Sequence, residues 1–366
     1  MTGSNPPAVL VIGTGLIGTS VGLAATAAGY RVWLTDANRE HAEQAAALGA
    51  GQVLGGDVWV SRAVAEDPEL VVVAVPPSVA PGVIERALGE HPSATITDVS
   101  SVKAPVLQAL AAVGADLSRV VGGHPMAGRE SSGPRAASAE LFHGRTWLLT
   151  PTPQTDPFRL AQVAALAEAA GAGVRVMPAE VHDQAVALTS HVPQVVASLM
   201  AGRLADADDD LVAVAGQGLR DVVRIAGSDP QLWADILATN AAEVRPVLAG
   251  VQADLDRLQE VFAAPDRVGA QTIADFIATG NRGAARLPAK HGGQAAAYSE
   301  VAVEVPDAPG ELGRLFLAAG DADINLEDVR IEHTVGRLTA IAHLYVLPER
   351  VPALQQALVA GGWLVV

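Results

Sequence analysis

The stretch Ala8-Val-Leu-Val-Ile-Gly-Thr-Gly-Leu-Ile-Gly18 decides the fold of this chain. Its first five residues are apolar and predict a buried strand, and a helical pattern of small and apolar residues follows directly. The turn between them carries Gly-x-Gly-x-x-Gly, which in this context is typical of a dinucleotide-binding site. Gly13 permits the tight turn, Gly15 lets a pyrophosphate approach the backbone, and Gly18 lets the helix pack closely on the strand.

Asp36, at the end of the next predicted strand, is the second part of this signal. It lies where an acidic residue binds the ribose hydroxyls of a dinucleotide. Because a carboxylate there repels a 2′-phosphate, the pattern favours NAD over NADP, although Arg39 leaves mixed use open. The alternative is a turn that needs small residues only for packing. The residues expected to bind NAD are Gly13, Thr14, Gly15, Leu16, Ile17, Gly18 and Asp36.

Strand and helix patterns alternate up to about Ala179, which predicts a parallel, doubly wound Rossmann-like sheet. Strands are expected over Ala8–Gly13, Arg31–Asp36, Leu70–Pro76, Ala94–Asp98, Val120–Gly122, Thr146–Thr150 and Gly173–Met177. Helices are expected over Leu16–Ala28, His41–Leu48, Val79–Leu88 and Ala104–Val113.

Beyond this point the patterns change twice. Apolar residues at helical spacing predict an all-α domain with helices over Val181–Leu204, Leu211–Ile225, Pro230–Leu248 and Val251–Thr279. The last part then predicts strands over Ser299–Val305, Asn325–Glu332, Leu338–Tyr345 and Trp363–Val366, with helices over Gly310–Ala319 and Val351–Ala360. That βαββαβ order is ferredoxin-like. The expected division is therefore 1–179, 180–282, a linker over 283–298, and 299–366.

The composition excludes several function classes. The 366 residues carry a net charge of −16, which argues against nucleic acid or an anionic membrane as a partner. No apolar run reaches the roughly 18 residues of a membrane span, and no basic stretch typical of a signal peptide precedes the first strand. The chain has no cysteine, so disulfides and thiolate metal sites are excluded. We expect no metal site and a cytoplasmic location.

Two segments that follow predicted strands carry candidate catalytic residues. His124 lies among glycines in Gly122–Gly128, where we expect a flexible loop, and histidine accepts protons near neutral pH. With nine histidines in the chain, an ordinary role stays open. Ser101 either bonds a substrate hydroxyl or the histidine, or else Ser100 or Ser101 caps the helix that begins near Lys103.

The helical segment offers candidate anion-binding residues. Arg220 and Arg224 are four residues apart and so share one face of the predicted helix. Guanidinium groups suit carboxylates, although salt bridges with Asp221 or Asp229 are an equally simple explanation. His191 also has the alternative of being an ordinary helix histidine.

Together these motifs resemble one family. The set G-x-G-L-I-G-x-S, D-V-S-S-V-K, G-G-H-P-M-A-G-x-E-x-S-G, S-H-x-P and R-D-x-x-R-I-A-x-S-D-P-x-x-W runs in order over roughly residues 8–280 and resembles the prephenate/arogenate dehydrogenases. The resemblance implies NAD-dependent oxidation of prephenate at C4 with loss of CO2, a step of tyrosine biosynthesis. His124 then matches the histidine that draws the C4 hydroxyl proton, and Ser101 the serine that orients both. The implied substrate-binding residues are Arg224, His191, Arg220, Glu130 and Trp233.

The segment from Val305 to Leu315 resembles the opening of an ACT domain, a regulatory ferredoxin-like module. The resemblance implies an amino-acid site at a homodimer interface, with tyrosine as the effector. Its residues would be Asp307, Pro309, Gly310 and Asn325. The alternative is a module that only dimerises the chain.

Three other functions remain open at this stage. Arogenate carries an ammonium where prephenate has an oxo group, so an arogenate-specific or dual-specificity enzyme is one alternative. A β-hydroxyacid-type dehydrogenase typically uses a lysine of the helical domain, whereas Lys290 lies in the expected linker. A non-catalytic amino-acid sensor on a dehydrogenase scaffold is disfavoured because His124, Ser101 and Arg224 are all present.

Overall fold

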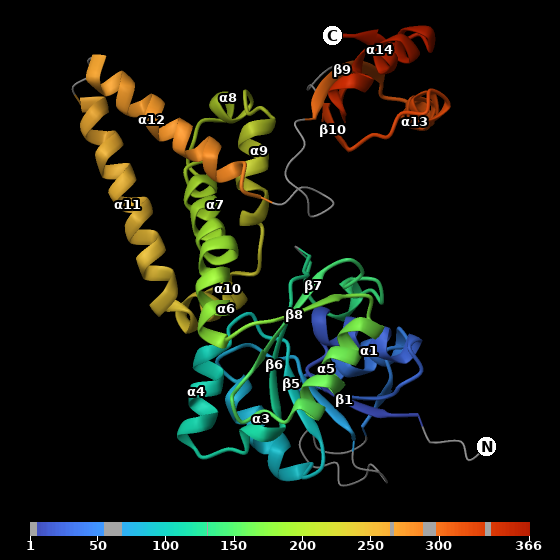
Figure 1. Cartoon of the computed structure of the whole chain (residues 1–366), viewed down its shortest axis with the longest axis vertical. Coiled ribbons are helices and arrows are strands. Elements are labelled where there is room, and N and C mark those ends of the chain that lie inside the picture. Colours follow the sequence, from blue (N-terminus) through green and yellow to red (C-terminus); the bar gives the residue numbers. More distant parts are fainter. Residues whose placement is uncertain (1–5, 55–67, 130, 264–266, 288–297, 334–337) are drawn as a thin grey trace. The chain divides into compact units, whose positions relative to one another are not determined.

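The computed structural model describes residues 6–54, 68–129, 131–263, 267–287, 298–333 and 338–366 (Figure 1). Contacts divide the chain into two compact units, Met1–Ala253 and Asp254–Val366. Each unit is described below by itself.

The first unit is built on an eight-stranded sheet of order β3-β2-β1-β4-β5-β6-β7-β8. Its strands are β1 (Ala8–Ile12), β2 (Arg31–Thr35), β3 (Gln52–Val53), β4 (Leu70–Val73), β5 (Thr95–Asp98), β6 (Val120–Pro125), β7 (Thr146–Pro151) and β8 (Gly173–Val176). The sheet is parallel from β3 to β6, as expected for a doubly wound fold. The expectation of a wholly parallel sheet is wrong, because β7 returns antiparallel to β6 and β8 then runs parallel to β7.

Helices cover both faces of this sheet, as Figure 1 shows. Val9 and Val11 of β1 pack on the side of α1 (Leu16–Ala27), α2 (Arg39–Ala47) and α5 (Pro157–Ala169). Leu10 and Ile12 pack on the side of α3 (Ala80–Glu90) and α4 (Ala104–Ala112). Alternate residues of one strand therefore supply two cores, which is why the run is apolar without a break.

The helical part of the first unit begins with a bent segment rather than the single regular helix expected over Val181–Leu204. Helix α6 (Ala179–Val186) passes through a π-helical turn (Ala187–His191) into α7 (Val192–Gly202). A π turn inserts an extra residue into the helical repeat and is frequent at functional sites. It sets the direction in which His191 leaves the helix.

Glycine and asparagine residues interrupt the other expected helices. The helix expected over Leu211–Ile225 is divided into α8 (Asp209–Val212), α9 (Gln217–Val223) and a 3-10 turn, with extended backbone at Gly216. Helix α10 (Pro230–Thr239) ends at Asn240, whose backbone is non-helical, so α11 (Ala241–Ala263) begins earlier than expected. Helix α12 (Arg267–Ala284) extends two residues into the expected linker, most of which lies outside the described residues.

The continuous segment Ala179–Gly202 is, by length and composition, apolar enough to cross a membrane. It also carries four buried polar residues, His182, Asp183, His191 and Gln194. The first three hydrogen-bond to residues of other elements of the same unit. These bonds hold those three polar residues of the segment inside the folded unit.

The C-terminal part of the second unit has the expected βαββαβ order. It consists of β9 (Ser299–Pro306), α13 (Glu311–Asp321), β10 (Asp328–His333), β11 (Thr339–Val346), α14 (Val351–Ala360) and β12 (Leu364–Val365). Its antiparallel sheet has the order β10-β11-β9-β12. Every second residue of β9 and β11 packs against Leu315 of α13 and Leu354 of α14. The strand expected from Asn325 starts only at Asp328.

Leu354→Ala should lower the free energy of unfolding of this module by about 2–5 kcal/mol, because its fully buried side chain leaves a cavity. Urea denaturation followed by circular dichroism measures the change. The matched control is Val359→Ala on the same helix, where the side chain is 62% exposed and the change should stay within about 0.5 kcal/mol. Equal losses in the two variants would contradict this core assignment.

Candidate active site

A cleft of about 710 Å³ opens at the carboxyl ends of β1, β4, β5 and β6. One wall is the glycine turn together with the segments that follow β4, β5 and β6, and the other comes from the π turn and from α10. Ligands of doubly wound sheets bind at this edge. Gly15, Ser101, His124, His191 and Trp233 all line the cleft, so the structure brings most of the predicted site residues together.

The glycine turn has the geometry that a dinucleotide requires. Gly13 has φ +95°, and a Cβ there would lie 2.3 Å from the Ala74 carbonyl oxygen. A Cβ on Gly18 would lie 1.9 Å from the Gly13 oxygen, so helix and strand pack only without a side chain. At Gly15 a Cβ would meet nothing within 4 Å, which leaves open space over the N-terminus of α1 for a pyrophosphate.

Asp36 fixes this turn and keeps a negative charge beside it. Its Oδ2 accepts hydrogen bonds from Thr14 N at 2.5 Å and Thr14 Oγ1 at 2.9 Å, and its Oδ1 accepts one from Asn38 N. Oδ1 can accept one further hydrogen bond, so Asp36 fits a ribose hydroxyl of NAD. Arg39 pairs with Glu43 at 2.8 Å along its own helix.

His124 lies within β6, where β7 pairs with it, and not in the flexible loop expected after Gly122. Two glycines make this possible, because a Cβ on Gly123 would lie 2.5 Å from the Asp98 carbonyl oxygen and one on Gly122 only 2.2 Å from Thr150 Oγ1. The backbone of Gly123 is also held by side chains: its N–H donates to Asp98 Oδ1 at 3.2 Å and its carbonyl accepts from Lys103 Nζ at 2.6 Å. His124 is thus fixed in place.

Lys103 and Asp98 form a buried ion pair beneath His124, with side chains 1% and 2% exposed. Lys103 Nζ also donates to Ser100 Oγ at 3.2 Å. Burial lowers the pKa of Lys103, while the Asp98 carboxylate acts in the opposite direction. Lys103 therefore holds the strand that carries His124.

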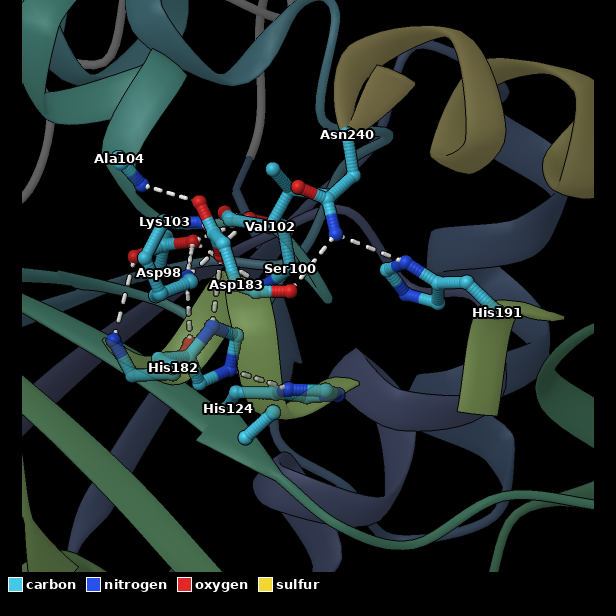
Figure 2. Close-up of polar contacts among 12 residues, drawn as sticks. Asp98, Ser100, Val102, Lys103, Ala104, His124, His182, Asp183, His191 and Asn240 are labelled. Carbon is cyan, nitrogen blue, oxygen red and sulfur yellow. Dashed lines mark hydrogen bonds and ion pairs between the residues drawn. The ribbon is translucent and has the colours of Figure 1, made fainter. Parts of the chain in front are cut away.

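A chain of hydrogen bonds connects His124 to a carboxylate (Figure 2). His124 Nδ1 lies 2.8 Å from His182 Nε2, and His182 Nδ1 lies 2.7 Å from Asp183 Oδ1. An ionised carboxylate only accepts, so His182 carries its proton on Nδ1 and, while neutral, accepts at Nε2. His124 then carries its proton on Nδ1, which leaves the lone pair of Nε2 available to a ligand.

Burial is the main cause that holds the pKa of His124 well below its usual range, and Coulombic interactions with His182, Lys103 and His191 act in the same direction. A histidine with a lowered pKa is neutral at physiological pH. His124 therefore combines the correct tautomer with the correct protonation state for a general base.

The α4 N-terminus is capped by a residue that the sequence did not indicate. Asp183 accepts hydrogen bonds from Lys103 N and Ala104 N, both at 2.8 Å. Capping by Ser100 or Ser101 was the alternative expected from the sequence, but Ser100 Oγ instead bonds Asp98 and the Val102 carbonyl. Ser101 lines the cleft, as its predicted role requires.

His191 is held by Asn240 on the opposite wall (Figure 2). Asn240 Nδ2 lies 2.9 Å from His191 Nδ1 and 3.0 Å from the Asp183 carbonyl oxygen. Burial lowers the pKa of His191 to about 4. Its Nε2 is buried without a hydrogen-bond partner among the described residues, and its ring lies edge-on to Trp233, with centroids 6.1 Å apart.

The two predicted arginines lie in different elements, since Arg220 belongs to α9 and Arg224 to the turn that follows it. Helix α9 ends at Val223, and Arg224 opens a 3-10 turn. Arg224 lines the cleft and also an adjoining polar pocket, which Arg129 and Arg145 line as well. Among the described residues that line the cleft, Arg224 occurs and Arg220 does not, so a role of Arg220 in substrate binding stays a prediction. The predicted site residue Glu130 lies outside the described residues.

The four predicted regulatory residues are all exposed. Asp307, Pro309 and Gly310 follow the end of β9, with Gly310 at φ +90° as the N-cap of α13. Asn325 precedes β10, whose first residue pairs with Tyr345, near the start of β9. Within one chain these two sets therefore lie at opposite ends of the sheet.

Sequence reasoning missed His182, Asp183 and Asn240. His182 and Asp183 are adjacent polar residues on the buried side of α6, beside Ala179 and Val186, a position that is costly unless both are hydrogen-bonded. That pattern could have marked them. Nothing in the local sequence marks Asn240.

Lys103→Met should lower the free energy of unfolding by about 3–5 kcal/mol, because it leaves the Asp98 carboxylate buried without its counter-charge. Chemical denaturation measures the loss. Arg39→Met is the matched control, since its ion pair with Glu43 has side chains 70% and 56% exposed and should contribute below about 1 kcal/mol. A loss no larger than that of the control would show that the buried pair is not required.

Comparisons with known proteins agree with this geometry. Residues 21–176 match the prephenate dehydrogenase nucleotide-binding domain and residues 178–271 match the prephenate dehydrogenase dimerization domain. A Streptomyces niveus protein named probable prephenate dehydrogenase NovF is 36% identical over 338 residues, covering 88% of this chain and 89% of that protein.

Two solved structures share the fold. Prephenate dehydrogenase from Aquifex aeolicus, in complex with hydroxyphenyl propionate and NAD+, is 28% identical with a TM-score of 0.67, covering 78% of this chain and 99% of that one. Synechocystis arogenate dehydrogenase is 25% identical with a TM-score of 0.61, covering 76% and 99%. With both family domains matched in order over more than half of its length, this chain belongs to the prephenate dehydrogenase family.

Proposed function

We propose that this protein oxidises prephenate with NAD to 4-hydroxyphenylpyruvate and CO2. The observation that carries the proposal is the half-buried, neutral His124, fixed by His182 and Asp183 with its free nitrogen available beside the dinucleotide turn. The related proteins support prephenate as the substrate and NAD as the cofactor.

The reaction depends mainly on a base that removes the proton of the C4 hydroxyl. NAD, when bound, accepts the hydride that leaves C4 of the ring. His124 Nε2 takes the proton of the C4 hydroxyl as its oxygen becomes a carbonyl. The bond from the ring to its carboxylate then breaks and CO2 leaves. The electron pair of that bond completes the aromatic ring, and the C4 oxygen takes the proton back from His124 to give the phenol. Aromatisation supplies the driving force, so the protein contributes mainly positioning and removal of one proton.

The histidine–histidine–aspartate chain supports this role of His124. When His124 accepts the substrate proton it becomes a cation, and the Asp183 carboxylate stabilises that charge through His182. The carboxylate does not itself need to take the proton, as in other catalytic histidine–carboxylate pairs. The same hydrogen bonds hold the ring in one orientation and one tautomer before the substrate arrives.

We assign the remaining cleft residues to substrate positioning. Arg224 holds a carboxylate of the substrate, and must orient it more than stabilise it, because tight binding of the departing group would oppose loss of CO2. Ser101 orients the C4 hydroxyl. His191 and Trp233 lie at the substrate's side chain. Glu130, which lies outside the described residues, completes the proposed set.

The second candidate function is arogenate oxidation, alone or together with prephenate. The similarity to Synechocystis arogenate dehydrogenase favours this second candidate. That protein shares the fold with this chain at nearly the same sequence identity as the prephenate dehydrogenase from Aquifex aeolicus does. A direct comparison of the two substrates decides between these functions.

We further propose that the enzyme is a cytoplasmic homodimer whose C-terminal module is an ACT domain that binds tyrosine. The matched dimerization domain supports the dimer, and the βαββαβ module supports the ACT assignment. Because Asp307–Gly310 and Asn325 lie at opposite ends of one module, an amino-acid site made of both needs a second copy of the chain.

His124→Asn should reduce kcat by about 10²–10⁴-fold, because the variant lacks the base, while the dissociation constant for NAD stays unchanged. Stopped-flow turnover and NAD titration by fluorescence measure the two quantities. The matched control is His333→Asn, an exposed histidine of β10, which should turn over as the natural chain does. Retained activity in His124→Asn would remove His124 from the mechanism.

The pH profile should show a base whose pKa is lowered. The pKa of His124 lies well below the ordinary 6.5, so kcat/KM should stay level as the pH falls through 6.5 and decline only at lower pH, as His124 becomes protonated. Initial rates across buffers of constant ionic strength measure the profile. A decline centred at pH 6.5 or above would contradict a half-buried, neutral His124.

The function itself is tested by NADH formation at about 340 nm with prephenate and with arogenate, each with NAD and with NADP, and each with and without tyrosine. We expect turnover of prephenate with NAD and a lower rate in the presence of tyrosine. Turnover of arogenate alone would establish the second candidate, and turnover of neither would leave an amino-acid sensor. A rate that tyrosine does not change would contradict the regulatory role.

A further inference from the structure

The amide of Asn240 has a fixed orientation, because its Nδ2 lies 3.0 Å from the backbone carbonyl of Asp183. A carbonyl oxygen only accepts, so the atom that faces it must be the amide nitrogen rather than the amide oxygen. Asn240 is 2% exposed, which leaves no water to exchange with this bond. One of the two amide hydrogens is thereby used on Asp183.

The other amide hydrogen determines the tautomer of His191. Asn240 Nδ2 lies 2.9 Å from His191 Nδ1, and since the amide nitrogen donates, Nδ1 must accept. With a pKa of about 4, the ring is neutral at physiological pH and carries only one proton. That proton must then lie on Nε2, so His191 can only donate at this atom.

Nε2 of His191 is one of the buried side-chain atoms that have no hydrogen bond among the described residues, and one that belongs to a residue of the cleft. It is buried, and no partner for it occurs among the described residues, while the His191 ring itself lines the cleft. A buried donor without an acceptor is costly, and a ligand that supplies an acceptor recovers that loss. The cleft therefore discriminates by the hydrogen-bonding character of the group placed against His191.

We propose that Asn240 is a specificity-determining residue, which fixes His191 as a hydrogen-bond donor and so selects a 2-oxo acid over the corresponding 2-amino acid. The inference rests on the proposed function, in which the substrate side chain lies against His191. The oxo group of prephenate is an acceptor and satisfies Nε2–H. The ammonium of arogenate only donates, so it leaves Nε2–H unsatisfied and meets a donor with a donor.

The first test measures the tautomer of His191 directly and does not depend on catalytic activity. Long-range ¹H–¹⁵N correlation spectra of the full-length, ¹⁵N-histidine-labelled protein report which ring nitrogen carries the proton, and the spectrum of His191→Gln identifies the His191 signals. We expect protonated Nε2 in the natural chain, a mixture of tautomers in Asn240→Leu, and protonated Nδ1 in Asn240→Asp at pH 8. Protonated Nδ1 in the natural chain would overturn the proposal.

The second test adds ligands to the same samples without NAD, so that no reaction takes place. Saturating prephenate should shift the His191 Nε2 signal, and arogenate at the same concentration should shift it much less. If prephenate leaves the signal in place, or if both ligands move it equally, the proposal is overturned. Failure of turnover in the NADH assay contradicts the proposed function instead, so the two failures are distinguishable.

The third test is the ratio of kcat/KM for prephenate to kcat/KM for arogenate. One hydrogen bond between uncharged groups corresponds to about a tenfold change, so the ratio should fall about tenfold in Asn240→Leu and further in Asn240→Asp. Leu237→Ala is the control, because it disturbs the packing beside Asn240 without removing these hydrogen bonds. An unchanged ratio in Asn240→Leu, or an equal fall in Leu237→Ala, would overturn the specificity role.

Discussion

The carboxylate of Asp183 is the interaction on which the rest of the site depends. One oxygen accepts hydrogen bonds from His182 Nδ1 and from the backbone N–H of Lys103, and the other accepts one from the backbone N–H of Ala104. It thus caps helix α4 of the sheet domain from a helix of the opposite wall. Buried carboxylates are tolerated only when such bonds are made. The two walls of the cleft are thus joined by the group that orients His124, the proposed base.

The ion pair of Lys103 and Asp98 holds the part of strand β6 that has no neighbouring strand on one side. Strand β6 pairs with β5 only as far as Val121, so at Gly123 the backbone has lost its neighbour on that side. The two side chains take over, one accepting from the Gly123 N–H and the other donating to its carbonyl. His124 can therefore stand at the end of the sheet, next to the cleft, without the mobility of a loop residue.

Local patterns were sufficient for the fold but not for these contacts. Strand and helix periodicity, together with the turn at Gly13 and the carboxylate of Asp36, predicted the Rossmann-like sheet and its cofactor, because those signals lie within a few residues of each other or at a fixed spacing. The reversal of β7 depends on pairing across a long connection. His124 and His182 are 58 positions apart and Lys103 and Asp183 are 80 apart, so no window along the chain contains either contact.

The backbone carbonyl of Asp183 also orients a residue on the opposite wall of the cleft. It fixes the Asn240 amide, which in turn fixes His191, while the side chain of Asp183 fixes His182 and through it His124. One residue thereby sets two histidines in opposite states, since His124 presents a lone pair at its Nε2 and His191 presents a proton at its own. A substrate that offers a hydroxyl proton to the first and an oxo oxygen to the second satisfies both, whereas a substrate that offers a donor to each leaves His191 unsatisfied.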